Sequence, residues 1–202
     1  MPDDVPSETD STPDAQDIAW MRRVQQGDLV ALQELIEAHQ ARVIGTIAKM
    51  LGGELEAEDL AQQVFIRVWK SAPRYEPTAK FTTWLFKITR NLVFNELRRR
   101  QRHGTQPLDA LDEEGRTSTQ TADASVKAPD AALLEQEMQT AIQVAIDSLP
   151  ETQRLAIVLR RYDEFSYEEI AEIMELSVPA VKSVLFRART ELREKLKHYL
   201  GE

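Results

Sequence analysis

Two stretches of the chain concentrate basic side chains of the kind that bind nucleic acids. Residues 80–102 contain seven Lys and Arg residues and a single acid, Glu96. Residues 177–197 contain six basic residues, with Glu191 and Glu194 as their acids. The chain of 202 residues has a net charge of −9, so both stretches stand out against an acidic background. Local clusters of this sign attract phosphate groups even when the total charge is negative.

The second basic stretch is predicted to contain the recognition helix of a helix-turn-helix. Ser166 and Glu169 have the spacing of a capping box, which marks the start of a helix. A short turn at residues 175–177 follows, and Pro179 suits the first turn of the next helix. The exposed positions of that helix combine cations, a hydroxyl and an apolar group, as a helix in the major groove requires. They are Lys182, Ser183, Phe186, Arg187 and Arg189.

The first basic stretch has aromatic residues beside its cations. An aromatic ring, several cations and an amide suit unstacked bases held on a basic surface. The residues concerned are Tyr75, Lys80, Thr82, Lys87, Arg90 and Asn91. Taken alone, the pattern is equally compatible with the solvated face of an ordinary helix.

Other chemistry is poorly represented in the chain. It has no Cys, and its three His residues lack the spacing of metal ligands. We find no Ser/His/Asp or Cys/His set, no Gly-rich phosphate loop and no HExxH-type motif. Acid pairs such as Glu58-Asp59 stand at expected helix starts, where the helix dipole explains them. We therefore expect no enzymatic activity, no cofactor and no metal.

The elements that must position these residues are predicted to be helices, because only 7 Gly and 9 Pro interrupt the chain. We expect an all-α fold of two small helical domains joined by a flexible acidic linker. The predicted boundaries are a disordered acidic tail over 1–16, a four-helix domain over 17–102, a linker over 103–130 and a helix-turn-helix domain over 131–202. Helix breaks are expected at residues 27–28 and 52–53 and around Pro73 and Pro77. The fourth helix, over about 82–100, should turn Phe81, Trp84, Leu85, Ile88 and Leu92 inward.

No apolar run approaches the roughly 20 residues that cross a bilayer. The N-terminal residues are acidic and rich in Pro, Ser and Thr, the reverse of a signal peptide. We therefore expect a cytoplasmic protein without membrane insertion.

Motifs in both domains resemble those of the extracytoplasmic-function (ECF, group 4) sigma factors of the sigma-70 family. The runs Ala57 to Phe65, Phe81 to Leu85 and Arg90-Asn91 look like their sigma-2 domain. Residues 148–189, with Ser166 to Ala171 and Phe186 to Arg189, resemble their sigma-4 domain. The resemblance covers about residues 18–100 and 135–198, and the two motif sets occur in the family's order and spacing.

This resemblance implies an alternative sigma factor that binds core RNA polymerase and recognises −35 and −10 promoter elements. The helix with Asp59, Gln62 and Gln63 would grip the clamp coiled coil of the polymerase β′ subunit. Promoter DNA would be read at two places, and Asn91 would lie near the pocket for a flipped base. An anti-sigma factor, made as a separate gene product, is a further candidate partner. The implied −10 residues are Tyr75, Lys80, Thr82, Thr83, Lys87, Arg90 and Asn91, and the −35 residues are those of the recognition helix named above.

Two positions depart from the family pattern. Gln63 stands where relatives usually have an acid, and Val184 stands where they often have a base. The first would weaken binding to core polymerase, and the second would alter or relax the preference for the −35 element.

Two other functions compete with this interpretation. A classical helix-turn-helix regulator would bind duplex DNA as a dimer on a palindrome, without contacting polymerase. Its four-helix domain would bind a ligand or form a dimer, and neither role requires the basic stretch at 80–102. A pure interaction module such as an anti-sigma factor would bind sigma or polymerase and show no promoter preference.

Overall fold

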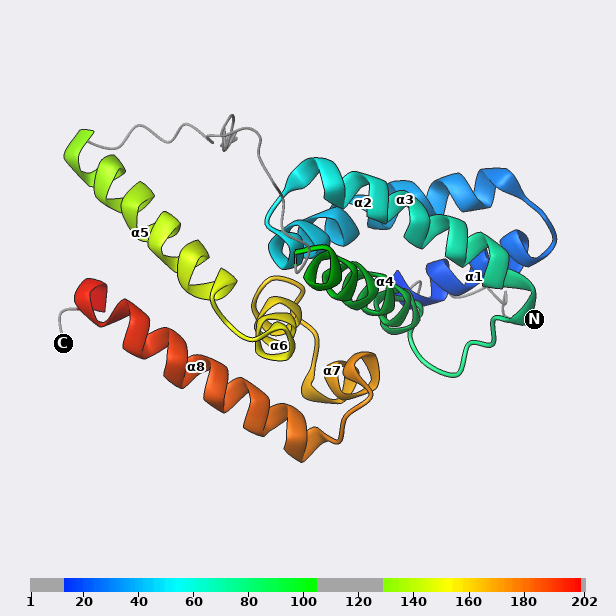
Figure 1. Ribbon diagram of the computed structural model, residues 1–202. Helices are drawn as coiled ribbons and strands as arrows, with labels where there is room; N and C mark the ends of the chain where they lie inside the picture. The colour runs from blue at the N-terminus through cyan, green and yellow to red at the C-terminus, as the bar shows by residue number, and fades with distance from the viewer. Residues whose placement is uncertain (1–12, 105–128, 201–202) are drawn as a thin grey trace, which may run out of the picture.

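The computed structural model describes residues 13–104 and 129–200, and every regular element in these ranges is helical. The N-terminal half (residues 13–104) contains α1 (Pro13–Gln25), α2 (Leu29–Leu51), α3 (Glu54–Ser71), the short 3-10 helix η1 (Ala72–Arg74) and α4 (Phe81–Gly104). The C-terminal half (residues 129–200) contains α5 (Pro129–Asp147), α6 (Glu151–Arg161), α7 (Tyr167–Met174) and α8 (Val178–Leu200). Figure 1 shows the N-terminal helices bundled together, with α6 and α7 beside α4. The expected all-α class is confirmed.

The helix breaks of the N-terminal half lie where the sequence predicted them. Asp28 caps α2, and its side chain accepts hydrogen bonds from the amides of Val30 and Ala31 at 2.9 and 3.1 Å. At the other end Gly52 adopts φ 78°, a left-handed conformation that favours glycine, and closes the helix. The chain then turns directly into α3, so α2 and α3 pack as neighbours.

The first helix starts earlier than predicted. The disordered tail was expected to reach residue 16, but α1 begins at Pro13, which suits a first helical turn. Residues 13–16 are ordered because Asp14 accepts a hydrogen bond from the amide of Phe81 at 2.9 Å. One turn later, Asp17 is buried and lies 2.8 Å from Nε2 of His39. The rest of the predicted tail lies outside the described residues, as do residues 105–128 of the predicted linker.

The C-terminal half contains the predicted helix-turn-helix. The Ser166 hydroxyl accepts from the Glu169 amide at 3.1 Å, and the Glu169 carboxylate accepts from the Ser166 amide at 2.7 Å. This reciprocal capping box begins α7. The turn into α8 is made without glycine, because Glu175 itself adopts the left-handed conformation with φ 56°. Ser177 then accepts from the Ala180 amide at 3.4 Å and starts α8.

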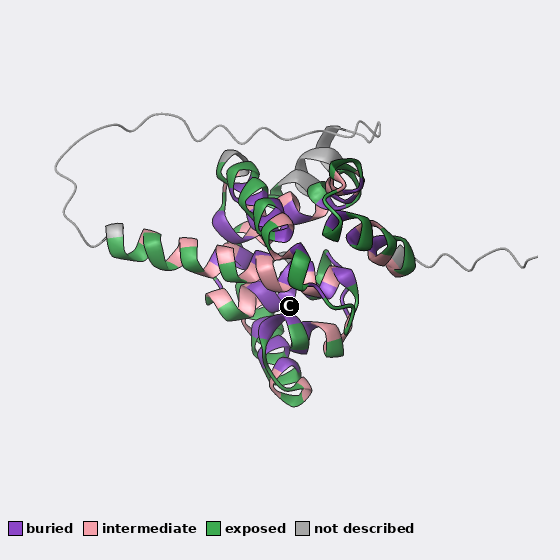
Figure 2. Cartoon of the chain, turned by 90° about the vertical axis from the view of Figure 1, so that its right-hand side faces the viewer, coloured by how far each residue is buried: buried purple, intermediate pink, exposed green. Residues whose placement is uncertain are grey.

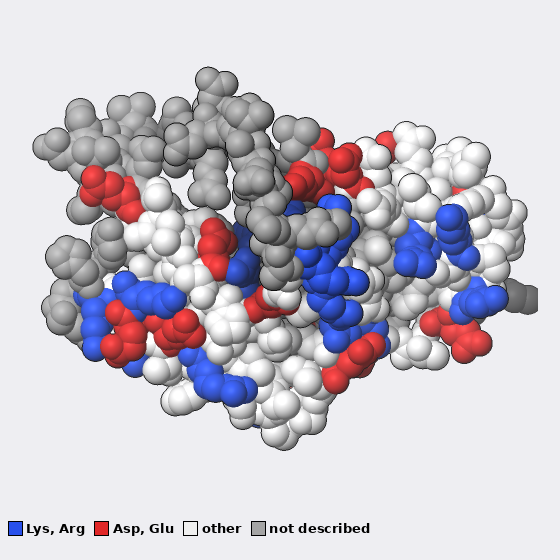
Figure 3. Space-filling view, in the orientation of Figure 1, with Lys and Arg blue, Asp and Glu red and all other residues white. Residues whose placement is uncertain are grey.

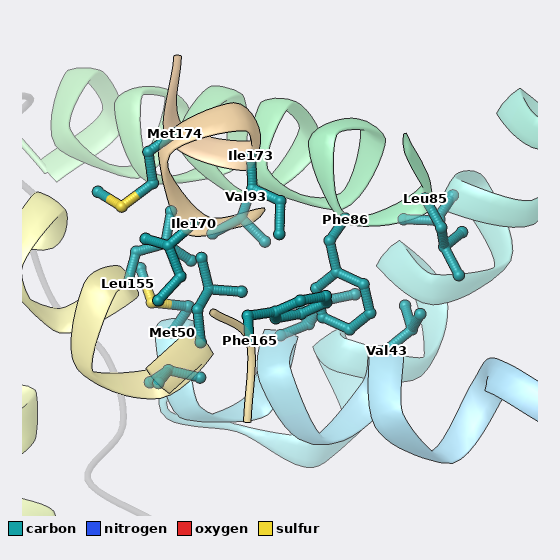
Figure 4. Close-up of a cluster of buried hydrophobic side chains, with 14 of the residues drawn as sticks. Val43, Met50, Leu85, Phe86, Val93, Leu155, Phe165, Ile170, Ile173 and Met174 are labelled. Atoms are coloured by element: carbon teal, nitrogen blue, oxygen red, sulfur yellow. The ribbon is translucent and has the colours of Figure 1, made fainter. Parts of the chain in front are cut away.

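The two halves share one hydrophobic core. Phe86 on α4 and Phe165, which precedes α7, meet edge to face with ring centroids 4.9 Å apart. The Arg42 guanidinium of α2 stacks over the Phe165 ring at 4.4 Å. Figure 4 shows side chains from both halves converging on this cluster, and Figure 2 shows buried residues along the faces where helices meet. The cluster contains Val43, Met50, Leu85, Phe86 and Val93 from the N-terminal half and Leu155, Phe165, Ile170, Ile173 and Met174 from the C-terminal half.

A buried polar contact accompanies this core. Asp163, only 7% exposed, accepts a hydrogen bond from the Thr46 hydroxyl at 2.8 Å and pairs with Arg42. Burial raises the pKa of the Asp163 carboxyl, while Thr46 and Arg42 oppose that rise. Both partners belong to α2, so the contact crosses from one half to the other.

Candidate promoter-binding and polymerase-binding surfaces

The outer face of α8 presents every residue predicted for duplex recognition. Lys182, Ser183, Arg187 and Arg189 are exposed, and the Phe186 ring is 70% exposed. At this exposure the ring is free to contact a partner surface. The Ser183 hydroxyl donates to the Pro179 carbonyl at 3.0 Å, so it lies against its own helix.

The inner face of α8 holds the helix at a fixed angle to α7. Val181, Val184 and Leu185 are buried, and so are Ile170 and Ala171 of α7. Because Val184 is only 7% exposed, its side chain faces the core and not the outer surface of α8. The expected effect of this departure on −35 preference would therefore act through the packing of α8, and it stays a prediction.

The second predicted surface lies at the start of α4. Lys80 precedes the helix and is exposed, Thr82, Lys87 and Arg90 are half-buried, and Asn91 is exposed. Figure 3 shows basic side chains gathered over α4, with acidic side chains beside them where α7 lies. The first turns of α4 therefore carry the cations and the amide that the sequence indicated.

Two residues predicted for the −10 element are not accessible here. The Tyr75 ring is 5% exposed and packs edge-on against Trp84 at 4.9 Å and against Phe81 at 6.2 Å. Burial, with Asp14 and Asp17 nearby, raises the pKa of its hydroxyl to about 12. Thr83 is 1% exposed. Apolar packing at the base of α4 takes both side chains inward, so neither reaches the surface in this structure. Their contact with the −10 element stays a prediction.

The cations of α4 have partners that the sequence did not predict. The ammonium of Lys80 lies 2.9 Å from Glu169, and the guanidinium of Arg90 lies 2.9 Å from Glu175. Lys87 is 3.7 Å from Glu172. All three acids belong to α7 or its turn. The only hint in the sequence was their regular three-residue spacing.

A groove runs between α2 and α3, on another face of the N-terminal half. Its volume is about 640 Å³, and Gln62 and Glu58 stand on its wall. The predicted polymerase-binding residues Asp59, Gln62 and Gln63 are all exposed on α3. The rest of the lining is mainly apolar and consists of Leu29, Leu32, Ile36, Gln40, Ile44, Ala61, Phe65, Ile66 and Trp69.

Sequence reasoning missed the apolar part of this groove. Leu29 is 65% exposed and Ile66 is 52% exposed, which is high for side chains of this kind. The available signal was Ile66 itself, because it follows Gln62 and Gln63 on the polar side of α3 at helical spacing.

Residues 13–104 and 129–200 contain no group of three or more His, Asp and Glu side chains that could hold a metal ion. Within these ranges no helix combines the length and the apolarity that crossing a membrane requires.

Comparisons with known proteins agree with this arrangement. A family model described as Sigma-70 region 2 matches residues 35–103, and one described as Sigma-70, region 4 matches residues 139–192. The chain is similar to the RNA polymerase sigma-H factor of Pseudomonas aeruginosa, with 31% identity over 93% of this chain and 97% of the relative. It is 32% identical to the ECF RNA polymerase sigma factor SigW of Bacillus subtilis, over 88% of this chain and 95% of that protein.

A solved structure supports the fold in three dimensions. The sigma factor RpoE of Bartonella quintana, in complex with the anti-sigma factor NepR, matches with a TM-score of 0.64 and 25% identity. The match covers 82% of this chain and 96% of the sigma factor.

Proposed function

This chain belongs to the ECF RNA polymerase sigma factors of the sigma-70 family, and we propose that its three surfaces divide the work of promoter-specific transcription initiation. It is an alternative sigma factor that binds core RNA polymerase and directs it to promoters. The single observation that carries the division of work is the placement of two basic surfaces and one apolar groove on separate faces of the molecule. The groove lies between α2 and α3, and the basic surfaces lie on α4 and α8.

The groove between α2 and α3 is the proposed contact with core polymerase. An amphipathic helix, such as one helix of the β′ clamp coiled coil, can lay its apolar face into a groove of this kind. Ile66 and Leu29 supply exposed apolar area, and Asp59, Gln62 and Gln63 supply the rim. Since Gln63 replaces the family's usual acid, the apolar groove carries a larger share of this contact.

The outer face of α8 is the proposed reader of the −35 element. Arg187 and Arg189 suit guanine or phosphate, Lys182 suits phosphate, and Phe186 suits a thymine methyl group. The start of α4 is the proposed −10 surface, with Lys80, Thr82, Lys87, Arg90 and Asn91 as its contacts. Tyr75 and Thr83 support this surface from within by packing.

Partners and place of action follow from membership of the family. Core polymerase and promoter DNA are the partners, and both act in the bacterial cytoplasm, where we propose that this protein works. The Bartonella quintana relative is held by an anti-sigma factor. We propose that an anti-sigma factor also controls this chain. We further propose that this chain has no enzymatic activity.

Run-off transcription tests the proposal directly. Core polymerase alone should give no specific transcripts from a promoter library, and addition of this protein should select a class of promoters. Ile66→Asp should reduce transcription by weakening binding to core polymerase. Val30→Asp is the matched control, because Val30 is 62% exposed on α2 but does not line the groove. Tight sequence-specific duplex binding by the free protein, with no effect on polymerase, would instead identify a classical regulator.

A further inference from the structure

The acids of α7 form a regular row that faces the cations of α4. Glu169, Glu172 and Glu175 follow one another at three-residue intervals, so they share one side of a helix. Their partners are the cations proposed to contact the −10 element. The three pairs are Lys80–Glu169 at 2.9 Å, Lys87–Glu172 at 3.7 Å and Arg90–Glu175 at 2.9 Å.

The pKa values of three of these groups are shifted toward their charged forms. The hydrogen bond from Arg90 lowers the pKa of the Glu175 carboxyl. The hydrogen bond to Glu169 raises the pKa of the Lys80 ammonium. Burial alone would raise the pKa of Glu169, but the Ser166 amide and Lys80 together lower it. These shifts favour the charged forms of the Glu175 and Glu169 carboxyls and of the Lys80 ammonium near neutral pH.

Apolar packing beneath the ion pairs holds the two rows in register. Phe86 of α4 meets Phe165 at the start of the helix-turn-helix, and Ile173 and Val93 are buried in the same cluster. The pairs themselves lie at the surface, where each contributes little to stability. The ion pairs matter because they occupy the cations of the −10 surface. A DNA phosphate and a Glu carboxylate compete for the same N–H donors.

The outer face of α8 is not involved in this contact. Phe186 is 70% exposed, and Lys182 and Arg187 are exposed as well. The same arrangement therefore covers one proposed DNA surface and leaves the other open.

We propose that α7 is an internal acidic partner of α4, which occupies the −10 cations until core polymerase separates the two halves. Single-stranded promoter DNA and the Glu169–Glu172–Glu175 row then exclude each other on α4. Engagement of the −10 element requires α7 to leave, whereas engagement of the −35 element does not. This inference rests on the proposed function of the two surfaces.

The first test measures single-stranded DNA binding by the free full-length protein. The probe is a fluorescein-labelled oligo(dT) of about 15 nucleotides, long enough to cover a basic surface of this kind. The variant is Glu172→Gln with Glu175→Gln, which spares the capping box at Glu169. We expect its binding to be about threefold to tenfold tighter than that of the wild type, because two surface ion pairs no longer compete.

A matched control separates the row from net charge. Glu164 and Glu168 precede the row, are exposed and form no ion pair with another described residue. Glu164→Gln with Glu168→Gln changes the net charge by the same amount and should leave the affinity within about twofold of the wild type. Equal tightening by the two double variants, or none by the first, would overturn the proposal.

The second test observes the contact without DNA. A carbodiimide activates a Glu carboxyl as an O-acylisourea, and a Lys amine in contact with it displaces the urea and forms an amide bond. Free protein should yield Lys80–Glu169 and Lys87–Glu172 cross-linked peptides by mass spectrometry, and promoter-bound holoenzyme should not. Absence of these peptides in the free protein, or equal yields in both states, would contradict the closed contact.

Run-off transcription distinguishes failure of this inference from failure of the proposed function. Glu172→Gln with Glu175→Gln should still direct promoter-specific transcripts with core polymerase. If neither this variant nor the wild type directs transcription, the proposed function fails, while the cross-linking result still decides whether α7 covers α4.

Discussion

The ring contact between Phe86 and Phe165 can be tested as a coupling energy. The two rings are 1% and 3% exposed and meet edge to face at 4.9 Å and 69°. Such a pair contributes about 0.5–1.5 kcal/mol beyond the apolar area that it buries. Replacing each Phe with Leu keeps an apolar side chain, so the main loss is the ring geometry.

A double-mutant cycle isolates this contribution. Phe86→Leu, Phe165→Leu, the double variant and the wild type are unfolded in urea and followed by circular dichroism. We expect each single variant to lower the free energy of unfolding by about 1–3 kcal/mol. The double variant should lose less than the sum, by about 1 kcal/mol, because the second substitution finds no ring partner left to remove.

The control cycle pairs Phe86→Leu with Leu185→Ala. Leu185 is buried on α8, which packs on α5, α6 and α7, so the two losses should add within about 0.5 kcal/mol. Full additivity in the Phe86–Phe165 cycle as well would mean that the rings do not touch in solution. The shared core of the two halves would then be refuted.

The two DNA surfaces and the buried acid give further predictions. Arg187→Ala should cost about 1–3 kcal/mol of binding free energy at one −35 base pair, whereas Lys182→Ala should weaken binding to all −35 variants alike. Run-off competition measures both effects, and equal responses would show that neither side chain reads bases. Asn91→Ala should impair transcription from duplex templates, and a pre-opened bubble template should restore much of the run-off yield. The bubble should restore less of the yield of Phe186→Ala. Equal failure of both variants on both templates would refute the proposed division between the two surfaces. The folded protein binds a proton at Asp163 more tightly than the unfolded chain does, because the folded-state pKa is raised. The stability of the wild type relative to Asp163→Asn should therefore fall as the pH rises above the ordinary pKa of an Asp carboxyl, about 4. Urea unfolding at a series of pH values measures this difference, and a constant difference would contradict a raised pKa.

Local features of the fold were predictable because they depend on neighbours in the sequence. The capping box at Ser166 and the break at Gly52 follow from hydrogen bonds and backbone angles within a few residues. The exposed face of α8 followed in the same way, since helical periodicity separates Phe186 and Arg187 from Val181. Such signals need no knowledge of the rest of the chain.

The contact between the halves was not predictable from periodicity. Phe86 falls outside the apolar stripe expected for α4, and its burial depends on Phe165, far away along the chain. The burial of Tyr75 was missed for a related reason. The sequence around a Tyr beside cations is the same whether its ring faces solvent or packs on Trp84. Both cases turn on tertiary packing, which a single sequence does not reveal.

The turn at Glu175 is a point of local frustration. A left-handed backbone costs a residue with a side chain about 1 kcal/mol, and Gly would adopt it freely. Glycine, however, would leave Arg90 without the carboxylate that it now contacts. The local preference of the turn and the long-range contact therefore disagree at this one residue. Glu175→Gly would remove the backbone strain in the helix-turn-helix and would also remove its ion pair with α4. One substitution would therefore stabilise the DNA-reading unit and make its separation from α4 easier.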